Sequence, residues 1–133
     1  MKRMTPIFLI MTLLLTGCTS PAPKTVPEAN TYRQITMQEA DEMMEKEENY
    51  VILDVRTHEE FAAGHIPGAI VIPNETIGTE DIPQLPDKDQ LIMVYCRSGN
   101  HSKQASDKLV KLGYTNIIEF GGIIDWPGEI VMD

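Results

Sequence analysis

The hydrophobic residues of this chain fall into short blocks separated by polar segments. Four blocks have the length and the β-branched content of buried strands: residues 50–55 (YVILDV), 69–72 (AIVI), 91–95 (LIMVY) and 116–120 (NIIEF). Continuous apolar runs of this kind are typical of parallel strands that are covered on both faces. The turn-rich, acidic segment 73–89 is expected to be a loop with one helical turn.

Helical patterns lie between these blocks. The first covers residues 37–48, and Thr36 and Glu39 before and within it have the spacing of a capping box. A second, shorter helix repeats that spacing and is expected to end at Gly64 in a left-handed conformation. A third covers residues 102–112. Because strands and helices alternate, we predict an α/β fold with a parallel sheet and right-handed crossovers.

Residues 1–17 have the pattern of a signal peptide. Two basic residues precede the apolar run 6–15, which is shorter than the roughly 20 residues that a membrane-spanning helix needs. The sequence LTGC, residues 15–18, resembles the lipobox of bacterial lipoproteins, in which Cys18 would be lipidated and become the N-terminus. The alternatives are an ordinary secretory signal and an uncleaved anchor. We expect export and anchoring by lipid to the extracytoplasmic or periplasmic face of the bacterial cell membrane.

The remainder divides into a tether and one domain. Residues 18–31 contain three prolines and few apolar residues, as expected of a tether, and residues 32–133 form the predicted domain. A chain of 133 residues with 42% hydrophobic residues has room for one modest core. The net charge of −9, or −11 after loss of the signal peptide, excludes a typical nucleic-acid binder. We expect a monomer.

Cys96 is the candidate reactive residue. It follows the third predicted strand, and in parallel sheets ligands bind at the carboxyl ends of the strands. The loop after it contains Gly99, and the backbone N–H groups of this loop and of the next helix can converge on an anion. Such a cradle stabilises a thiolate or a persulfide, so no other side chain need act as a base. The alternative is a buried, inert thiol.

Three stretches resemble the signatures of the rhodanese family of sulfurtransferases. They are DVRTHEEFAAGHIPGAI (54–70), YCRSGNHS (95–102) and LGYTNIIEFGGIIDW (112–126). The resemblance implies a single rhodanese-like domain with a five-stranded parallel sheet and helices on both faces. It also implies that Cys96 carries a persulfide and that the following loop residues bind the substrate: Arg97, Ser98, Gly99, Asn100, His101 and Ser102.

The chemistry implied by the resemblance is a two-step sulfur transfer. Cys96 attacks the outer sulfur of thiosulfate, sulfite leaves, and cyanide or a thiol acceptor then attacks the persulfide. No cofactor is implied, and a lone thiol with scattered histidines gives no metal-site pattern. His101 stands where many similar loops carry arginine, so a titrating cation replaces a fixed one. Asp54 and Arg56 are interpreted as a structural pair that supports the loop.

Other functions fit less well. A tyrosine-phosphatase-like enzyme or an arsenate reductase would use C-x5-R, but the sixth residue after Cys96 is Ser102. A dithiol reductase would lack a resolving cysteine if Cys18 is lipidated. The stronger alternative is a non-catalytic, lipid-anchored rhodanese module that binds a partner or senses sulfide or redox state through Cys96.

Overall fold

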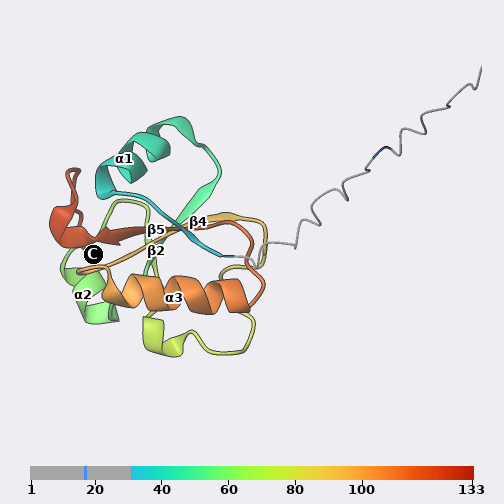
Figure 1. The fold of residues 1–133 in the computed structure, drawn as a ribbon. Coiled ribbons are helices and arrows are strands. Elements are labelled where there is room, and N and C mark those ends of the chain that lie inside the picture. Colours follow the sequence, from blue (N-terminus) through green and yellow to red (C-terminus); the bar gives the residue numbers. More distant parts are fainter. Residues whose placement is uncertain (1–16, 18–30) are drawn as a thin grey trace, which may run out of the picture.

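The computed structural model describes Gly17 and residues 31–133, and in them it confirms the predicted α/β fold (Figure 1). Five parallel strands form one sheet in the order β1-β5-β4-β2-β3. The elements are β1 (Arg33–Gln34), α1 (Met37–Lys46), β2 (Tyr50–Asp54), α2 (His58–Ala63), β3 (Ile70–Val71), η1 (Asn74–Thr76), β4 (Leu91–Cys96), α3 (Asn100–Lys111), β5 (Ile117–Gly122) and η2 (Ile123–Asp125).

The predicted leader lies almost wholly outside the described residues. This holds for the apolar run 6–15, for the lipobox cysteine Cys18 and for residues 18–30 of the predicted tether. Among residues 31–133, no helix is long and apolar enough to span a membrane.

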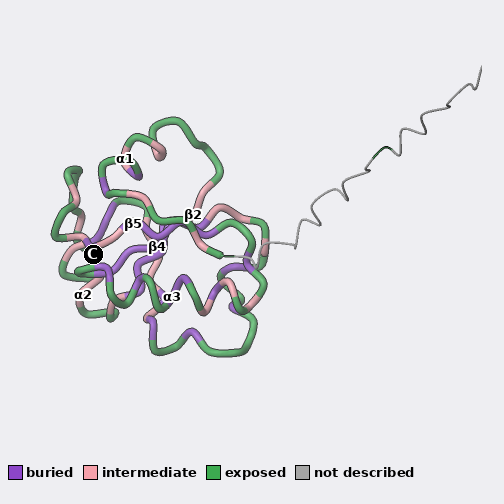
Figure 2. The backbone as a smooth tube through the Cα atoms, in the orientation of Figure 1, coloured by how far each residue is buried: buried purple, intermediate pink, exposed green. Residues whose placement is uncertain are grey.

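The sheet separates two hydrophobic layers, with α1 on one face and α3 on the other (Figure 1). Successive side chains of a strand point to opposite faces, so Leu53 and Val94 pack on the α3 side, whereas Ile52 and Met93 pack on the α1 side. The central strands are accordingly the most buried part of the backbone (Figure 2). Each fully buried side chain of this size stabilises the fold by about 1.5–3 kcal/mol relative to exposure.

The predicted starts of α1 and α2 are confirmed by their caps. Thr36 Oγ1 accepts the Glu39 N–H at 3.1 Å, and the Glu39 carboxylate accepts the Thr36 N–H at 2.7 Å, which completes the capping box. At α2, Thr57 Oγ1 accepts the Glu60 N–H at 3.1 Å. Local side chain–backbone bonding therefore fixes both helix starts.

The prediction for Gly64 is wrong. Its φ of 161° is extended backbone and not the left-handed conformation. The chain leaves α2 directly into an antiparallel bridge, in which the His65 N–H donates to the Val131 carbonyl at 2.9 Å. Because a residue near the C-terminus supplies this partner, the sequence around Gly64 carries no signal for it.

One strand and several element boundaries also differ from the sequence predictions. β1 was not predicted, because Arg33 and Gln34 are exposed and polar and are held only by pairing with β5. Helix α3 begins at Asn100, two residues before the predicted start. Strand β5 continues to Gly122, past the predicted end at Phe120.

Candidate active site

Cys96 is the last residue of β4, and the loop after it bends sharply back onto its sulfur. Gly99, the N-cap of α3, has a φ of 102°, a left-handed conformation that other residues rarely adopt. This turn directs the Gly99 N–H to Cys96 Sγ at 3.0 Å. One backbone donor of the expected cradle is therefore in place, aimed at the sulfur.

The end of β5 supports this loop by close backbone approach. The pairing of β4 with β5 shifts register between Val94 and Cys96, so that Cys96 lies opposite Gly122. A Cβ atom added at Gly122 would lie 2.1 Å from the Arg97 carbonyl oxygen. Only a glycine lets the two backbones lie this close together.

Ser102 lies in the first turn of α3, and its side chain is fully buried. Its Oγ is 3.3 Å from Cys96 Sγ and 2.9 Å from the Gly99 carbonyl oxygen. The helix thus brings a hydroxyl within hydrogen-bond distance of the sulfur. Of the predicted substrate-binding residues, Ser102 and Gly99 are the two with recorded hydrogen bonds to Cys96.

Glu119 is a buried acidic residue that the sequence analysis missed. Its side chain comes from β5, and Glu119 is 3% exposed. Its Oε1 accepts the Ser102 hydroxyl at 2.6 Å and the Gly121 N–H at 2.9 Å. A carboxylate inside the otherwise apolar run NIIEF was the available signal, because charged residues are rarely fully buried without a partner.

The remaining predicted substrate-binding residues are Arg97, Ser98, Asn100 and His101, and all four are exposed. Arg97 lines a cavity of about 400 Å³ beside the loop. The cavity is also lined by residues of α2, by its flanking segments and by the C-terminal segment: Arg56, Glu60, Ala63, Gly64, Ile123, Ile124 and Ile130. Cys96 itself is 1% exposed, so its sulfur lies beneath the loop and not on the open surface.

Asp54 and Arg56 form an ion pair at the end of β2. Arg56 Nη2 lies 2.7 Å from Asp54 Oδ2 and also donates to the Gly64 carbonyl at 2.7 Å. Burial by itself lowers the pKa of Arg56, but the hydrogen bond and charge of Asp54 outweigh it, and the pKa is raised. The pair ties β2 to the end of α2, and no recorded hydrogen bond joins it to Cys96.

Tyr95 links this ion pair to the residue before the loop. Its ring lies 5.8 Å from the Arg56 guanidinium carbon, and its hydroxyl accepts the Ile66 N–H at 3.2 Å. Burial and the nearby charge of Asp54 raise the pKa of Tyr95, so its phenol stays neutral. These contacts hold the end of β4 in position.

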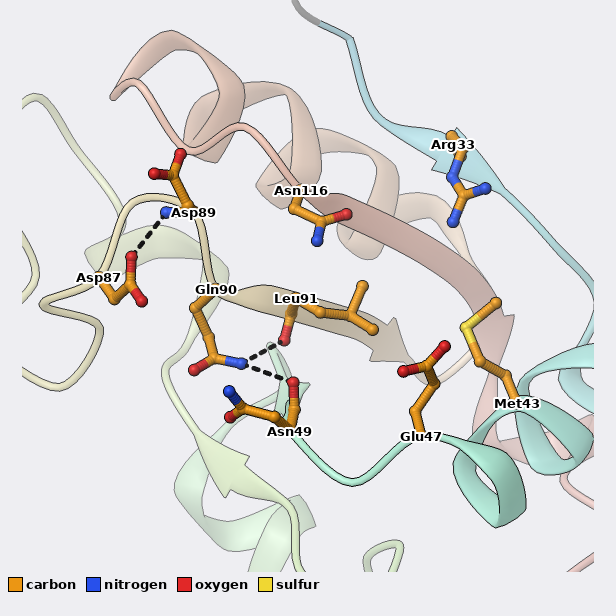
Figure 3. Close-up of a pocket in the computed structure, with 9 residues that line it drawn as sticks. All are labelled: Arg33, Met43, Glu47, Asn49, Asp87, Asp89, Gln90, Leu91 and Asn116. Carbon is orange, nitrogen blue, oxygen red and sulfur yellow. Dashed lines mark hydrogen bonds between the residues drawn. The ribbon is translucent and has the colours of Figure 1, made fainter.

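Another pocket, of about 380 Å³, lies at the other end of the strands, near the start of β4 (Figure 3). Two of its side chains bond to neighbouring backbone: the Gln90 amide donates to the Asn49 carbonyl at 2.9 Å, and the Asp87 carboxylate accepts the Asp89 N–H at 2.9 Å. It contains none of the predicted site residues. Within residues 31–133, no three His, Cys, Asp or Glu side chains are grouped as metal ligands.

The chain resembles known sulfurtransferases in sequence. It is 37% identical over 73 residues to the thiosulfate sulfurtransferase PspE of Escherichia coli, an alignment that covers 55% of this chain and 70% of that protein. It is 39% identical over 80 residues to a sulfurtransferase of Allochromatium vinosum, covering 59% of this chain and 73% of that one. It is 32% identical over 104 residues to the adenylyltransferase and sulfurtransferase UBA4 of Candida albicans. This alignment covers 73% of this chain but only 24% of that protein.

Solved structures show the same fold. The rhodanese-like domain of an Anabaena protein has a TM-score of 0.69 at 26% identity, covering 77% of this chain and 81% of that domain. A rhodanese with anions from E. coli has a TM-score of 0.58 at 35% identity, covering 63% of this chain and 99% of that one. The rhodanese-like domain family matches residues 36–128. The chain therefore belongs to the rhodanese-like domain family, with sulfurtransferases among its relatives.

Proposed function

We propose that the protein is a sulfurtransferase that carries sulfane sulfur on Cys96, from thiosulfate or a related persulfide donor to cyanide or a thiol acceptor. The observation that carries the proposal is the geometry around the sulfur. Cys96 Sγ receives the Gly99 N–H at 3.0 Å and lies 3.3 Å from the Ser102 hydroxyl. Both groups can donate to an anionic sulfur, and such charge-assisted bonds are about twice as strong as neutral ones.

The transfer takes place in two displacements. The Cys96 thiolate attacks the outer sulfur of thiosulfate, the sulfur–sulfur bond of the donor breaks, and sulfite leaves with the electron pair. The acceptor then attacks the outer sulfur of the persulfide, and the second sulfur–sulfur bond breaks to restore the thiolate. The negative charge stays on sulfur near the loop in both steps, where fixed donors stabilise it.

Arg97 is suited to hold the sulfonate end of a donor such as thiosulfate. It is exposed, adjoins Cys96 in the chain and lines the cavity beside the loop. A guanidinium binds such oxyanions through paired hydrogen bonds. The net charge of −9 does not oppose this, because charges beyond a Debye length of about 8 Å are largely screened at physiological salt. His101, exposed on the first turn of α3, is a second cationic candidate when protonated.

One observation favours the non-catalytic alternative. At 1% exposure, Cys96 offers little surface to a donor, as expected if the domain binds a partner or if the thiol is only a slow redox site. Turnover distinguishes the two functions, because a sulfur carrier must transfer sulfur repeatedly.

The proposed function is tested on the chain with Cys18→Ala, in which Cys96 is the only thiol. After incubation with thiosulfate, intact mass should increase by one sulfur atom, and cyanide should remove that sulfur with formation of thiocyanate. Steady-state thiocyanate formation should then follow ping-pong kinetics. A folded protein whose mass does not change would contradict the proposal.

We also propose that Cys18 is lipidated and anchors the domain to the bacterial membrane. The full chain expressed in a bacterium should partition into detergent with the membrane fraction. Cys18→Ala should block lipidation and accumulate as an unprocessed precursor, which N-terminal sequencing identifies. If both forms are soluble and share one N-terminus, the lipobox interpretation is wrong.

A further inference from the structure

Glu119 occupies a position where the fold favours an apolar side chain. It lies in β5, between β1 and β4, and its hydrogen bond to Ser102 places the carboxylate on the α3 face. The hydrogen bonds recorded for its carboxylate in the described chain come from a hydroxyl and a backbone N–H, both uncharged. A buried carboxylate without a cation is costly to keep ionised, so its place here calls for a chemical reason.

The Ser102 hydroxyl connects this carboxylate to the nucleophile. Its oxygen is 2.6 Å from Glu119 Oε1 and 3.3 Å from Cys96 Sγ, and a hydroxyl has one proton to donate. When Ser102 donates to the carboxylate, its oxygen can accept the Cys96 S–H. When Ser102 donates to a Cys96 thiolate instead, its oxygen can accept a proton from a neutral Glu119 carboxyl. The same three side chains satisfy both arrangements.

We propose that Glu119 receives the thiol proton of Cys96 through the Ser102 hydroxyl. The S–H bond of Cys96 breaks and its proton bonds to Ser102 Oγ, while the O–H bond of Ser102 breaks and that proton bonds to Glu119 Oε1. The products are a thiolate and a neutral carboxylic acid, and the net charge of the three residues stays at one negative. The inference rests on the proposed role of Cys96 as sulfur carrier, and it makes Glu119 a positioning residue for the proton.

This relay has a consequence for the persulfide. With the proton held by Glu119, the persulfide anion on Cys96 lies near a neutral group, whereas an ionised Glu119 would place two negative charges one hydroxyl apart. The relay also replaces the expectation that backbone donors alone keep the sulfur charged. Those donors stabilise the thiolate, and Glu119 accounts for the proton.

Few other charges face this pair. On the β2 side, Asp54 and Arg56 are paired with each other. Arg97 in the loop and His101 on α3 are exposed, and so are Arg33 on β1 and Asp125 on η2. Because histidine is the side-chain type that commonly changes charge near neutral pH, the His101→Ala variant serves as a control.

The test is the pH dependence of Cys96 alkylation by iodoacetamide, in the Cys18→Ala chain without any sulfur donor. A coupled pair takes up protons in two macroscopic steps. We therefore expect two rises in rate, separated by a plateau in which the rate changes less than about twofold per pH unit, because the pair holds one proton throughout. Glu119→Gln, which keeps the size of the side chain and an oxygen for Ser102, should show a single rise.

Three further variants identify the groups that cause the two rises in rate. Ser102→Ala should lower the rate on the plateau, because the hydroxyl that donates to the thiolate in the singly protonated pair is gone. Glu45→Gln, an exposed acid on α1, should keep both rises. The His101→Ala background should keep both rises too, which excludes the imidazole as their origin.

A single rise in the wild-type profile overturns the relay without recourse to any variant. Two rises that persist unchanged in Glu119→Gln overturn it as well. The result is independent of the sulfur donor. A two-step profile in a chain that takes no sulfur from thiosulfate would refute the proposed function and keep the relay. Sulfur uptake with a single-step profile would support the proposed function and refute the relay.

Discussion

Cys96→Ser should lose sulfur uptake from thiosulfate by at least about 10³-fold, because a serine hydroxyl is not ionised at neutral pH and attacks sulfur poorly. The serine oxygen can still accept the Gly99 N–H that now reaches Cys96 Sγ at 3.0 Å, so the loop should keep its shape. The measurement is intact mass after incubation with thiosulfate, in the Cys18→Ala background.

Stability provides the control for this variant. The sulfur is buried in the layer under α3, and its replacement by a hydroxyl that has partners should change the free energy of unfolding by only about 1 kcal/mol. Urea unfolding measures this. Sulfur uptake retained in Cys96→Ser would place the carrier elsewhere in the chain and refute the assignment.

Gly122→Ala should have the second-largest effect. The added Cβ would lie 2.1 Å from the Arg97 carbonyl oxygen and 2.6 Å from Ser98 Cα, and both are backbone atoms that cannot rotate away. The loop must move, and a displacement of about 1 Å can cost about 10²-fold in rate. We expect sulfur uptake to fall by that factor and the free energy of unfolding to fall by about 3 kcal/mol, at the upper end for overpacking.

Gly78→Ala is the matched control. No heavy atom lies within 4 Å of the Cβ that it would add, and Gly78 is not among the glycines with positive φ. It should leave the rate of sulfur uptake unchanged and alter the free energy of unfolding by less than about 1 kcal/mol. Equal effects of the two substitutions would mean that contact of Gly122 with the loop does not hold the site.

Much of the fold could be predicted from local sequence. The apolar blocks 50–55 and 91–95 became β2 and β4 because a strand buried on both faces needs a continuous apolar run. The starts of α1 and α2 could be predicted because Thr36 and Thr57 bond to the backbone only three residues away. The position of Cys96 at a strand end followed from the end of its own apolar block.

Contacts between distant residues could not be predicted in this way. β1 exists because β5 supplies hydrogen bonds to two polar residues, and Gly64 is extended because Val131 pairs with its neighbour. The local sequence around β1 and Gly64 does not indicate either partner, because strand pairing depends on which distant segment the fold places alongside.

The candidate site likewise has a part set by local sequence and a part set by contacts between distant residues. The sharp turn after Cys96 could be predicted from local sequence, because the strand, Gly99 and the following helix are adjacent in the chain. Only the tertiary structure brought Glu119 to Ser102, across 17 positions, by laying β5 against β4 under α3. A buried carboxylate can be noticed in a sequence, but which group it serves depends on the side chain that packing places at hydrogen-bond distance from it.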